Sequence, residues 1–246
     1  MPQTHKTEGY NKNLFLKIVF TALFAAFTAA GAFIAIPIGP VPIVLQNLFA
    51  VLAGLILGSL MGSASVALYL LAGILGLPVF AGGTGGIARF AGPTGGYLPG
   101  YLLAALTAGL IAGRPSNRAR NIECVRVTNV TRPRPGNSPP PEMMKGRPRA
   151  NTRTPIPRII AAVIAGFLII YVPGVIWLKA SRNLSWARAF MIGFFPYIIG
   201  DVFKGIAAVL IAPRLRRTAA DFLEPPLSER QRAPLQRSAD SRYGGK

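Results

Sequence analysis

Long apolar runs separated by short polar or glycine-rich stretches fill the first half of the chain and return near its end. A helix that crosses a bilayer needs about 20 mostly apolar residues. The apolar run over 43–81 is too long for one span, and we divide it where Gly58 and Gly62 interrupt the large side chains. We expect Pro196 to bend the early part of the last span. The pattern predicts an all-α protein, a six-helix transmembrane bundle with spans at 17–37, 44–60, 62–79, 96–112, 159–178 and 189–212.

Composition agrees with an integral membrane protein. Of the 246 residues, 51% are hydrophobic and 14% are charged, and the mean hydropathy is +0.43, which is too apolar for an ordinary soluble domain. A net charge of +19 would by itself favour a nucleic-acid partner. However, Lys and Arg gather before the first span, between the fourth and fifth spans and after the sixth, where a multispan protein keeps its cytoplasmic parts. We therefore expect no nucleic-acid partner.

The charge distribution also predicts the topology and the segments of the chain. We expect a multi-pass protein of the plasma (inner) membrane, with both termini cytoplasmic. The segment between the fourth and fifth spans is rich in Arg and Pro and too poor in apolar residues to order itself, so we expect it to be disordered. The expected segments are a cytoplasmic head at 1–13, helices one to four with an outer loop at 14–113, a basic cytoplasmic insertion at 114–157, helices five and six at 158–213, and a basic cytoplasmic tail at 214–246.

Two charged residues lie inside the last span. Asp201 and Lys204 are three residues apart, so they share a helix face and can partly neutralise each other. Charges inside a membrane span face the bundle interior or a wet cavity and mark functional sites; a purely structural ion pair is the alternative. Asp201 is the only acid in the expected spans, and the chain has one Cys and one His. The sequence thus favours neither an enzyme nor a metal site.

The outer loop between the third and fourth spans is rich in glycine. It contains the pentads GGTGG at 82–86 and GPTGG at 92–96, and Arg89 between them is the only charged residue from 18 to 113. The spacing matches neither a phosphate-binding P-loop nor a dinucleotide fingerprint. A lone Arg beside free backbone N–H groups could meet an anion. The alternatives are a flexible connector and an Arg that reaches the membrane interface.

Two further features could serve binding or assembly. Gln46 and Asn47 follow the proline-rich link between the first two spans, where their amides could bind a polar ligand group or only begin a helix. The first span carries small residues at four-residue spacing, namely Ala22, Ala26 and Ala30 in one row and Ala25 and Ala29 in another. Such rows let helices approach closely, either inside this chain or against a partner.

Several motifs together resemble one family. The stretches GLPVFAGGTGG, GPTGGYLPGY, PYIIGDVFKGIAAVLIAPRLR, VPIVLQN and GVIWL are similar to those of the BioY family, the biotin-specific S components of energy-coupling factor (ECF) transporters. The similarity covers about 14–113 and 157–217. It implies a six-helix membrane fold that binds biotin near its outer face. The insertion at 114–157 and the tail lie outside the resemblance.

The resemblance also implies a site and partners. Lys204 and Arg89 would supply positive charge for the biotin carboxylate, and Asp201 would accept from a ureido N–H or orient Lys204. The implied substrate-binding residues, with those indicated by the sequence, are Asp201, Lys204, Arg89, Gly85, Gly86, Thr94, Gly95, Gly96, Tyr97, Gln46 and Asn47. Ala25 and Ala29 would dock the chain onto a transmembrane coupling protein, which two ABC-type ATPases would energise. Membrane lipid is the remaining expected partner, and no cofactor is expected.

Two other functions stay open at the level of sequence. The chain could be an S component for another vitamin, because a related scaffold would share the same general pattern. A lipid-binding or structural membrane protein that uses its basic segments is a further alternative, although it would leave the glycine-rich loop and the two charges in the last span without a purpose.

Overall fold

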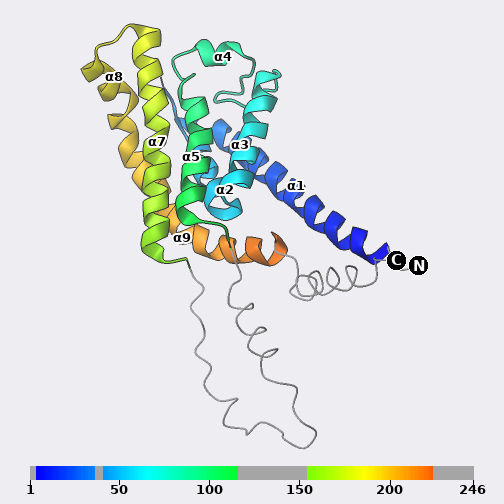
Figure 1. Cartoon of the computed structure of the whole chain (residues 1–246). Helices are drawn as coiled ribbons and strands as arrows, with labels where there is room; N and C mark the ends of the chain where they lie inside the picture. The colour runs from blue at the N-terminus through cyan, green and yellow to red at the C-terminus, as the bar shows by residue number, and fades with distance from the viewer. Residues whose placement is uncertain (1–3, 37–40, 116–153, 224–246) are drawn as a thin grey trace, which may run out of the picture.

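The computed structural model describes residues 4–36, 41–115 and 154–223, and most of them are helical (Figure 1). The helices are α1 (Thr4–Phe33), α2 (Gln46–Leu57), α3 (Ser59–Ile74), α4 (Ala88–Ala91), α5 (Tyr97–Ala112), α7 (Ile156–Arg182), α8 (Trp186–Gly193) and α9 (Phe195–Leu223). The short strands β1 (Ala35–Ile36) and β2 (Ile43–Val44) pair antiparallel. Within the described residues, the expected spans correspond to α1, α2, α3, α5, α7 and α9, so the all-α prediction is confirmed.

Helix α2 forms the centre of the bundle. All of its residues except Phe49 are buried, as expected for a helix that is apolar on every side and surrounded by others. It packs against α1, α3, α5, α7 and α9. The outer helices instead expose large apolar side chains such as Phe15, Ile164 and Phe203. A buried apolar centre inside an apolar outer surface is the arrangement of a membrane bundle.

In the part of the chain that the structure describes, three stretches are long and apolar enough to cross a membrane, namely Leu14–Phe33, Ile156–Arg182 and Trp186–Ala220. The inner helices α2, α3 and α5 are shorter, with 12, 16 and 16 residues. Helices α2 and α3 end before their expected spans do, whereas α5 matches its expected span to within one residue. Helix α2 stops at Gly58, whose φ of 85° is readily adopted only by glycine. The predicted division of the 43–81 run is thereby confirmed.

The last predicted span is wrong at both ends. A single helix over 189–212 was expected, but α8 ends at Gly193 and α9 begins at Phe195. The break falls at Phe194, just before Pro196, whose missing N–H is tolerated in the first turn of α9. At its other end α9 passes through Pro213 and continues to Leu223, beyond the expected start of the tail. The rest of that tail, 224–246, lies outside the described residues.

The first span and the basic insertion also differ from expectation. Helix α1 begins at Thr4, inside the expected head, and ends at Phe33, where the chain enters the β1–β2 hairpin instead of remaining helical to residue 37. The hairpin was not predicted, because two-residue strands leave no periodic pattern in the sequence. The insertion falls mostly in 116–153, outside the described residues, so its predicted disorder stays a prediction.

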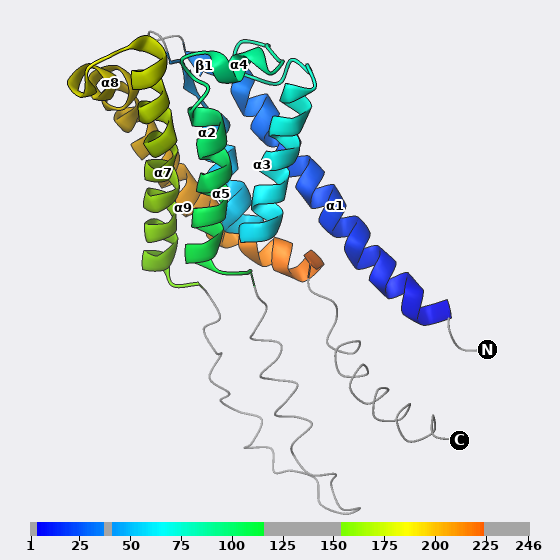
Figure 2. The ribbon, with the colours of Figure 1, turned by 45° about the horizontal axis from the view of Figure 1, so that its top comes forward.

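The bundle has two different ends, which Figure 2 displays from one side. The loop end carries α4, the β1–β2 hairpin and the turn between α7 and α8. At the opposite end, which we call the basic end, α5 stops at Ala112, α7 starts at Ile156 and α9 finishes at Leu223. The two charged residues predicted in the last span lie near the start of α9, and its later Arg residues lie toward the basic end.

Candidate functional site

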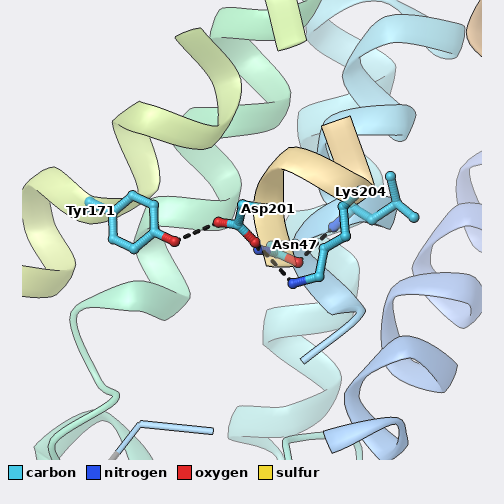
Figure 3. Close-up of polar contacts among 5 residues, drawn as sticks. Asn47, Tyr171, Asp201 and Lys204 are labelled. Carbon is cyan, nitrogen blue, oxygen red and sulfur yellow. Dashed lines mark hydrogen bonds and ion pairs between the residues drawn. The ribbon is translucent and has the colours of Figure 1, made fainter. Parts of the chain in front are cut away.

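Three polar side chains meet around Asp201 in the interior of the bundle (Figure 3). Lys204 Nζ lies 2.9 Å from Asp201 Oδ1, and Asn47 Nδ2 donates to the same oxygen at 2.8 Å. On the other side, the Tyr171 hydroxyl donates to Asp201 Oδ2 at 2.5 Å. The side chains of Asp201 and Lys204 are only 8% and 10% exposed. We call these four residues the Asp201 cluster.

Three helices build the Asp201 cluster. Asp201 and Lys204 occupy successive turns of one face of α9, so their i, i+3 spacing produces the predicted pair. Asn47 lies in the first turn of the central helix α2, and its own Oδ1 accepts from the Leu48 N–H at 3.0 Å. Tyr171 comes from the middle of α7. Residues far apart in the sequence are thus joined through one carboxylate.

The observed hydrogen bonds leave Asp201 with few unused acceptor sites and Lys204 with several unused donors. A carboxylate can accept about four hydrogen bonds, and Asp201 already accepts three. An ammonium group has three N–H donors, and Lys204 uses one of them on Asp201. Among the described residues, Lys204 therefore retains most of its donor capacity, whereas Asp201 is nearly saturated. The cluster is better equipped to bind an anionic or carbonyl oxygen than another donor.

Aromatic rings enclose the cluster on the α7 side. The Tyr171 ring lies edge-on to Phe194 at a centroid distance of 4.7 Å and to Tyr97 at 6.3 Å. Tyr97 in turn donates its hydroxyl to the Gly193 carbonyl at 2.8 Å, so it joins α5 to the α8–α9 break. Gln46 is fully buried and donates to the Tyr69 hydroxyl at 2.6 Å. Gln46 thus forms a separate pair, while Tyr97 contacts the cluster through Tyr171.

The glycine-rich loop is held together by close backbone contacts. Gly86 has a φ of 90° and donates its N–H to the Gly73 carbonyl at 2.7 Å. A methyl group on Gly96 would lie 2.3 Å from Trp177 Cβ, so the loop approaches α7 closely. Methyl groups on Gly85 and Gly95 would likewise clash with backbone carbonyls, and Thr94 is half-buried. The loop therefore packs tightly against the bundle, which argues against the alternative of a flexible connector.

Arg89 is not part of the Asp201 cluster. It lies on the short helix α4 at the loop end, where its side chain is exposed (Figure 2). Within the described residues, its guanidinium makes neither a hydrogen bond nor an ion pair. The structure therefore leaves its predicted contact with a ligand carboxylate as a prediction.

The predicted docking residues on α1 face inward. Ala25 is 7% exposed and belongs to the hydrophobic core, and Ala29 packs partly against the same core. The other row of small residues, Ala22, Ala26 and Ala30, is exposed. The burial of Ala25 within the single chain does not favour it as a contact for a second protein, and docking through Ala25 and Ala29 stays a prediction. Sequence spacing identified two rows but could not show which one faced outward.

Tyr171 was missed by the sequence analysis, although a signal was present. It is a residue with a polar hydroxyl inside an otherwise apolar helix, LIIYVPGVIW, two positions before Pro173. A buried Tyr hydroxyl usually needs a partner, and here the partner is the carboxylate of Asp201. Among the described residues, no group of three or more His, Cys, Asp or Glu gathers that could hold a metal.

Sequence comparison finds clear relatives. A family model described as the BioY family matches residues 5–221. The "Probable biotin transporter BioY" of Pyrococcus horikoshii is 36% identical over 200 residues, which cover 81% of this chain and 96% of the relative. The "Biotin transporter BioY" of Thermotoga maritima is 33% identical over 201 residues, which cover 82% and 96% of the two chains.

Structural comparison gives the same result for the fold. The crystal structure of the S-component for biotin from an ECF-type ABC transporter superposes with a TM-score of 0.61. The two chains are 28% identical, and the match covers 88% of this chain and 95% of the other. The similarity therefore extends over the bundle as a whole, and it confirms the predicted S-component-like architecture.

Proposed function

The chain belongs to the BioY family, as its motifs predicted, and from this premise we propose that it binds biotin and mediates its uptake as the S component of an ECF transporter. The observation that carries the proposal is the Asp201 cluster, a polar group built from three helices inside a membrane bundle. Intramembrane ionisable groups are costly and mark substrate sites. As a transporter component, the protein needs no catalytic group of its own.

Biotin offers three kinds of surface to such a site. Its carboxylate requires donors, its ureido group has two N–H donors and a carbonyl acceptor, and its ring and chain are apolar. The cluster offers the spare N–H donors of Lys204 beside the apolar faces of Tyr171 and Phe194. A few placed polar groups against apolar walls are typical of small-molecule sites.

The hydrogen bonds favour one division of roles over the other. Lys204 would donate to the ligand carboxylate, because most of its donors are free. Asp201 would orient Lys204 instead of receiving a ureido N–H, because its oxygens already accept from three donors. Arg89, the glycine loop with Gly85, Gly86 and Thr94 to Gly96, and the amides of Gln46 and Asn47 remain the proposed surroundings of the ligand.

The proposed transport complex has further subunits. We expect a transmembrane coupling protein and two ABC-type ATPases, with the basic end and both termini on the cytoplasmic side. The exposed row Ala22, Ala26 and Ala30 on α1 is a more suitable docking surface than the buried Ala25. After biotin binds, the energised complex would reorient this chain and release biotin inside.

Binding of labelled biotin to the purified protein tests the proposal. Wild type should bind, and Lys204→Ala and Asp201→Ala should bind more weakly, whereas Lys17→Ala serves as the control because Lys17 is exposed on α1. Full retention of affinity by both cluster variants would remove the site assignment. A folded wild-type protein that does not bind biotin would remove the substrate.

Two competing functions give different results in related experiments. For an S component of another vitamin, an unlabelled vitamin other than biotin would displace the label or bind where biotin does not. A lipid-binding or structural protein that acts through its basic insertion would lose function when 118–152 is deleted, whereas biotin binding should survive that deletion.

A further inference from the structure

A group of arginines gathers where α5 ends, at the basic end of the bundle. Arg216 of α9 is 5% exposed and donates to the carbonyls of Leu55 near the end of α2, Ala112 at 3.1 Å and Gly113 at 2.9 Å. Arg158 of α7 donates through Nε to the Ile111 carbonyl at 2.5 Å. These guanidiniums thus hold the free carbonyls at the ends of two helices, where cations are favoured.

Two exposed arginines surround this buried one. A methyl group on Gly113 would lie 3.6 Å from Arg158 Nη2, and a methyl group on Gly58 would lie 3.7 Å from Arg114 Cγ. Gly113 and Arg114 are adjacent in the sequence, so Arg114 follows α5 directly, and the side chain of Arg158 reaches the same turn from the first turn of α7. Both side chains are exposed. We call Arg114, Arg158 and Arg216 the arginine cluster.

The arginine cluster carries more positive charge than its surroundings neutralise. The ends of α2 and α5 each contribute about half a negative charge, so about one charge in total opposes three guanidiniums. Asp201 is the only acid whose side chain the structure describes, and Lys204 already pairs with it. Within the described residues, about two positive charges of the arginine cluster therefore remain available for an anion.

The surroundings of the cluster indicate the kind of anion. Large apolar side chains on the same helix ends are well exposed, including Leu60 at 70%, Leu110 at 61% and Ile156 at 60%. Exposed apolar residues beside exposed guanidiniums are the pattern of the boundary between acyl chains and headgroups. An acidic protein surface would not need the apolar neighbours, whereas a phospholipid satisfies both.

We propose that Arg114 and Arg158, supported by the buried Arg216, bind the phosphate group of an anionic phospholipid at the basic end. The planar guanidinium forks suit phosphate oxygens. Helix-end carbonyls and Arg216 fix the base of the site, and the exposed apolar side chains receive the acyl chains. This inference depends on the membrane setting of the bundle and not on the identity of the ligand at Asp201.

Native mass spectrometry of the full chain tests the proposal. The protein is released from membranes that contain phosphatidylglycerol and phosphatidylethanolamine in equal amounts. The wild-type protein should retain more phosphatidylglycerol than phosphatidylethanolamine. Each basic group near a membrane surface strengthens binding about fivefold, so Arg114→Gln should reduce the retained anionic lipid about fivefold and Arg114→Gln with Arg158→Gln about 25-fold. Arg182→Gln with Arg188→Gln removes two exposed charges at the opposite end and should change retention less than twofold.

Two further measurements separate the alternatives. Arg158→Lys keeps the charge but loses the guanidinium fork, so it should retain more lipid than Arg158→Gln. Glycerol 3-phosphate, which lacks acyl chains, should not displace the lipid, and displacement would indicate a site for a soluble phosphate instead. The proposal would be overturned if both double variants lost the same amount of anionic lipid, or if wild type retained the two lipids equally. It would also be overturned if the variants lost a protein partner while their lipid retention stayed unchanged.

Discussion

Two buried charged residues on α9 have different kinds of hydrogen-bonding partners. Asp201 and Arg216 are 8% and 5% exposed, and both have hydrogen-bonding partners. The partners of Asp201 are side chains from α2, α7 and α9, whereas those of Arg216 are main-chain carbonyls near the ends of α2 and α5. Side-chain partners can rotate to admit a ligand, but helix-end carbonyls cannot move without the helices. The comparison supports the proposal that Asp201 belongs to a ligand site, and it places Arg216 in the framework of the bundle.

The difference between a framework charge and a site charge predicts different effects of mutation. Loss of a framework charge leaves buried carbonyls unsatisfied and lowers the free energy of unfolding. Loss of a site charge changes ligand affinity more than stability, because neighbouring side chains can rearrange. The following predictions measure both quantities for each variant, in order of decreasing expected effect.

Arg216→Met should have the largest effect, a decrease of about 3 kcal/mol in the free energy of unfolding, because it removes the donors of three carbonyls in buried or partly buried contacts. Denaturant unfolding in detergent measures this value. Arg217→Met, an exposed neighbour on the same turn, is the control and should change stability by less than about 0.5 kcal/mol. Equal effects in the two variants would contradict the framework role of Arg216.

Lys204→Met should reduce biotin affinity about 50-fold, because a charge-assisted hydrogen bond contributes about 1.5–3 kcal/mol. Titration with labelled biotin measures the affinity. Stability should also fall, because Asp201 loses its buried counter-ion, although Asp201 keeps Asn47 and Tyr171 as donors. Lys17→Met is the matched control on an exposed surface. A loss of stability without a loss of affinity would place Lys204 with Arg216 in the framework.

Asp201→Asn should reduce biotin affinity about tenfold, less than Lys204→Met does. The amide can still accept from Tyr171 or Lys204, but it no longer supplies the charge that holds the ammonium. The same titration tests the division of roles between the two residues. A larger loss for Asp201→Asn than for Lys204→Met would show that Asp201 contacts the ligand directly.

Tyr171→Phe should have the smallest effect, a reduction of about fivefold in affinity, because one neutral hydroxyl contributes about 1 kcal/mol. The ring and its contacts with Phe194 and Tyr97 are kept. Tyr197→Phe is the control, since the hydroxyl of Tyr197 donates to the Val41 carbonyl and not to the Asp201 cluster. If both variants bind biotin like wild type, Tyr171 is only a packing residue.

Much of the architecture could be predicted from local pattern. The expected spans and the division at Gly58 follow from apolar runs and one glycine, which are local properties of the chain. The Asp201–Lys204 pair follows from helix periodicity alone. The family could also be recognised, because its motifs are short and continuous in the sequence.

Other features depended on how the helices pack. The sequence showed two rows of alanines on α1, and only packing revealed that Ala25 faces the core and Ala26 faces outward. The break at Phe194 and the continuation of α9 through Pro213 were likewise seen only in the folded chain. Arg216 resembled one more charge of a basic tail until its carbonyl partners were known.

By itself, the sequence determined the membrane class, the approximate spans, the family and the two charges of the last helix that share a face. Tertiary structure alone decided that Asn47 and Tyr171 complete the Asp201 cluster, that Lys204 keeps free donors, and that Arg216 is buried. The reason is that periodicity along one helix is a short-range property. The partner of a buried charge is chosen by helices that are distant in sequence and meet only in the folded bundle.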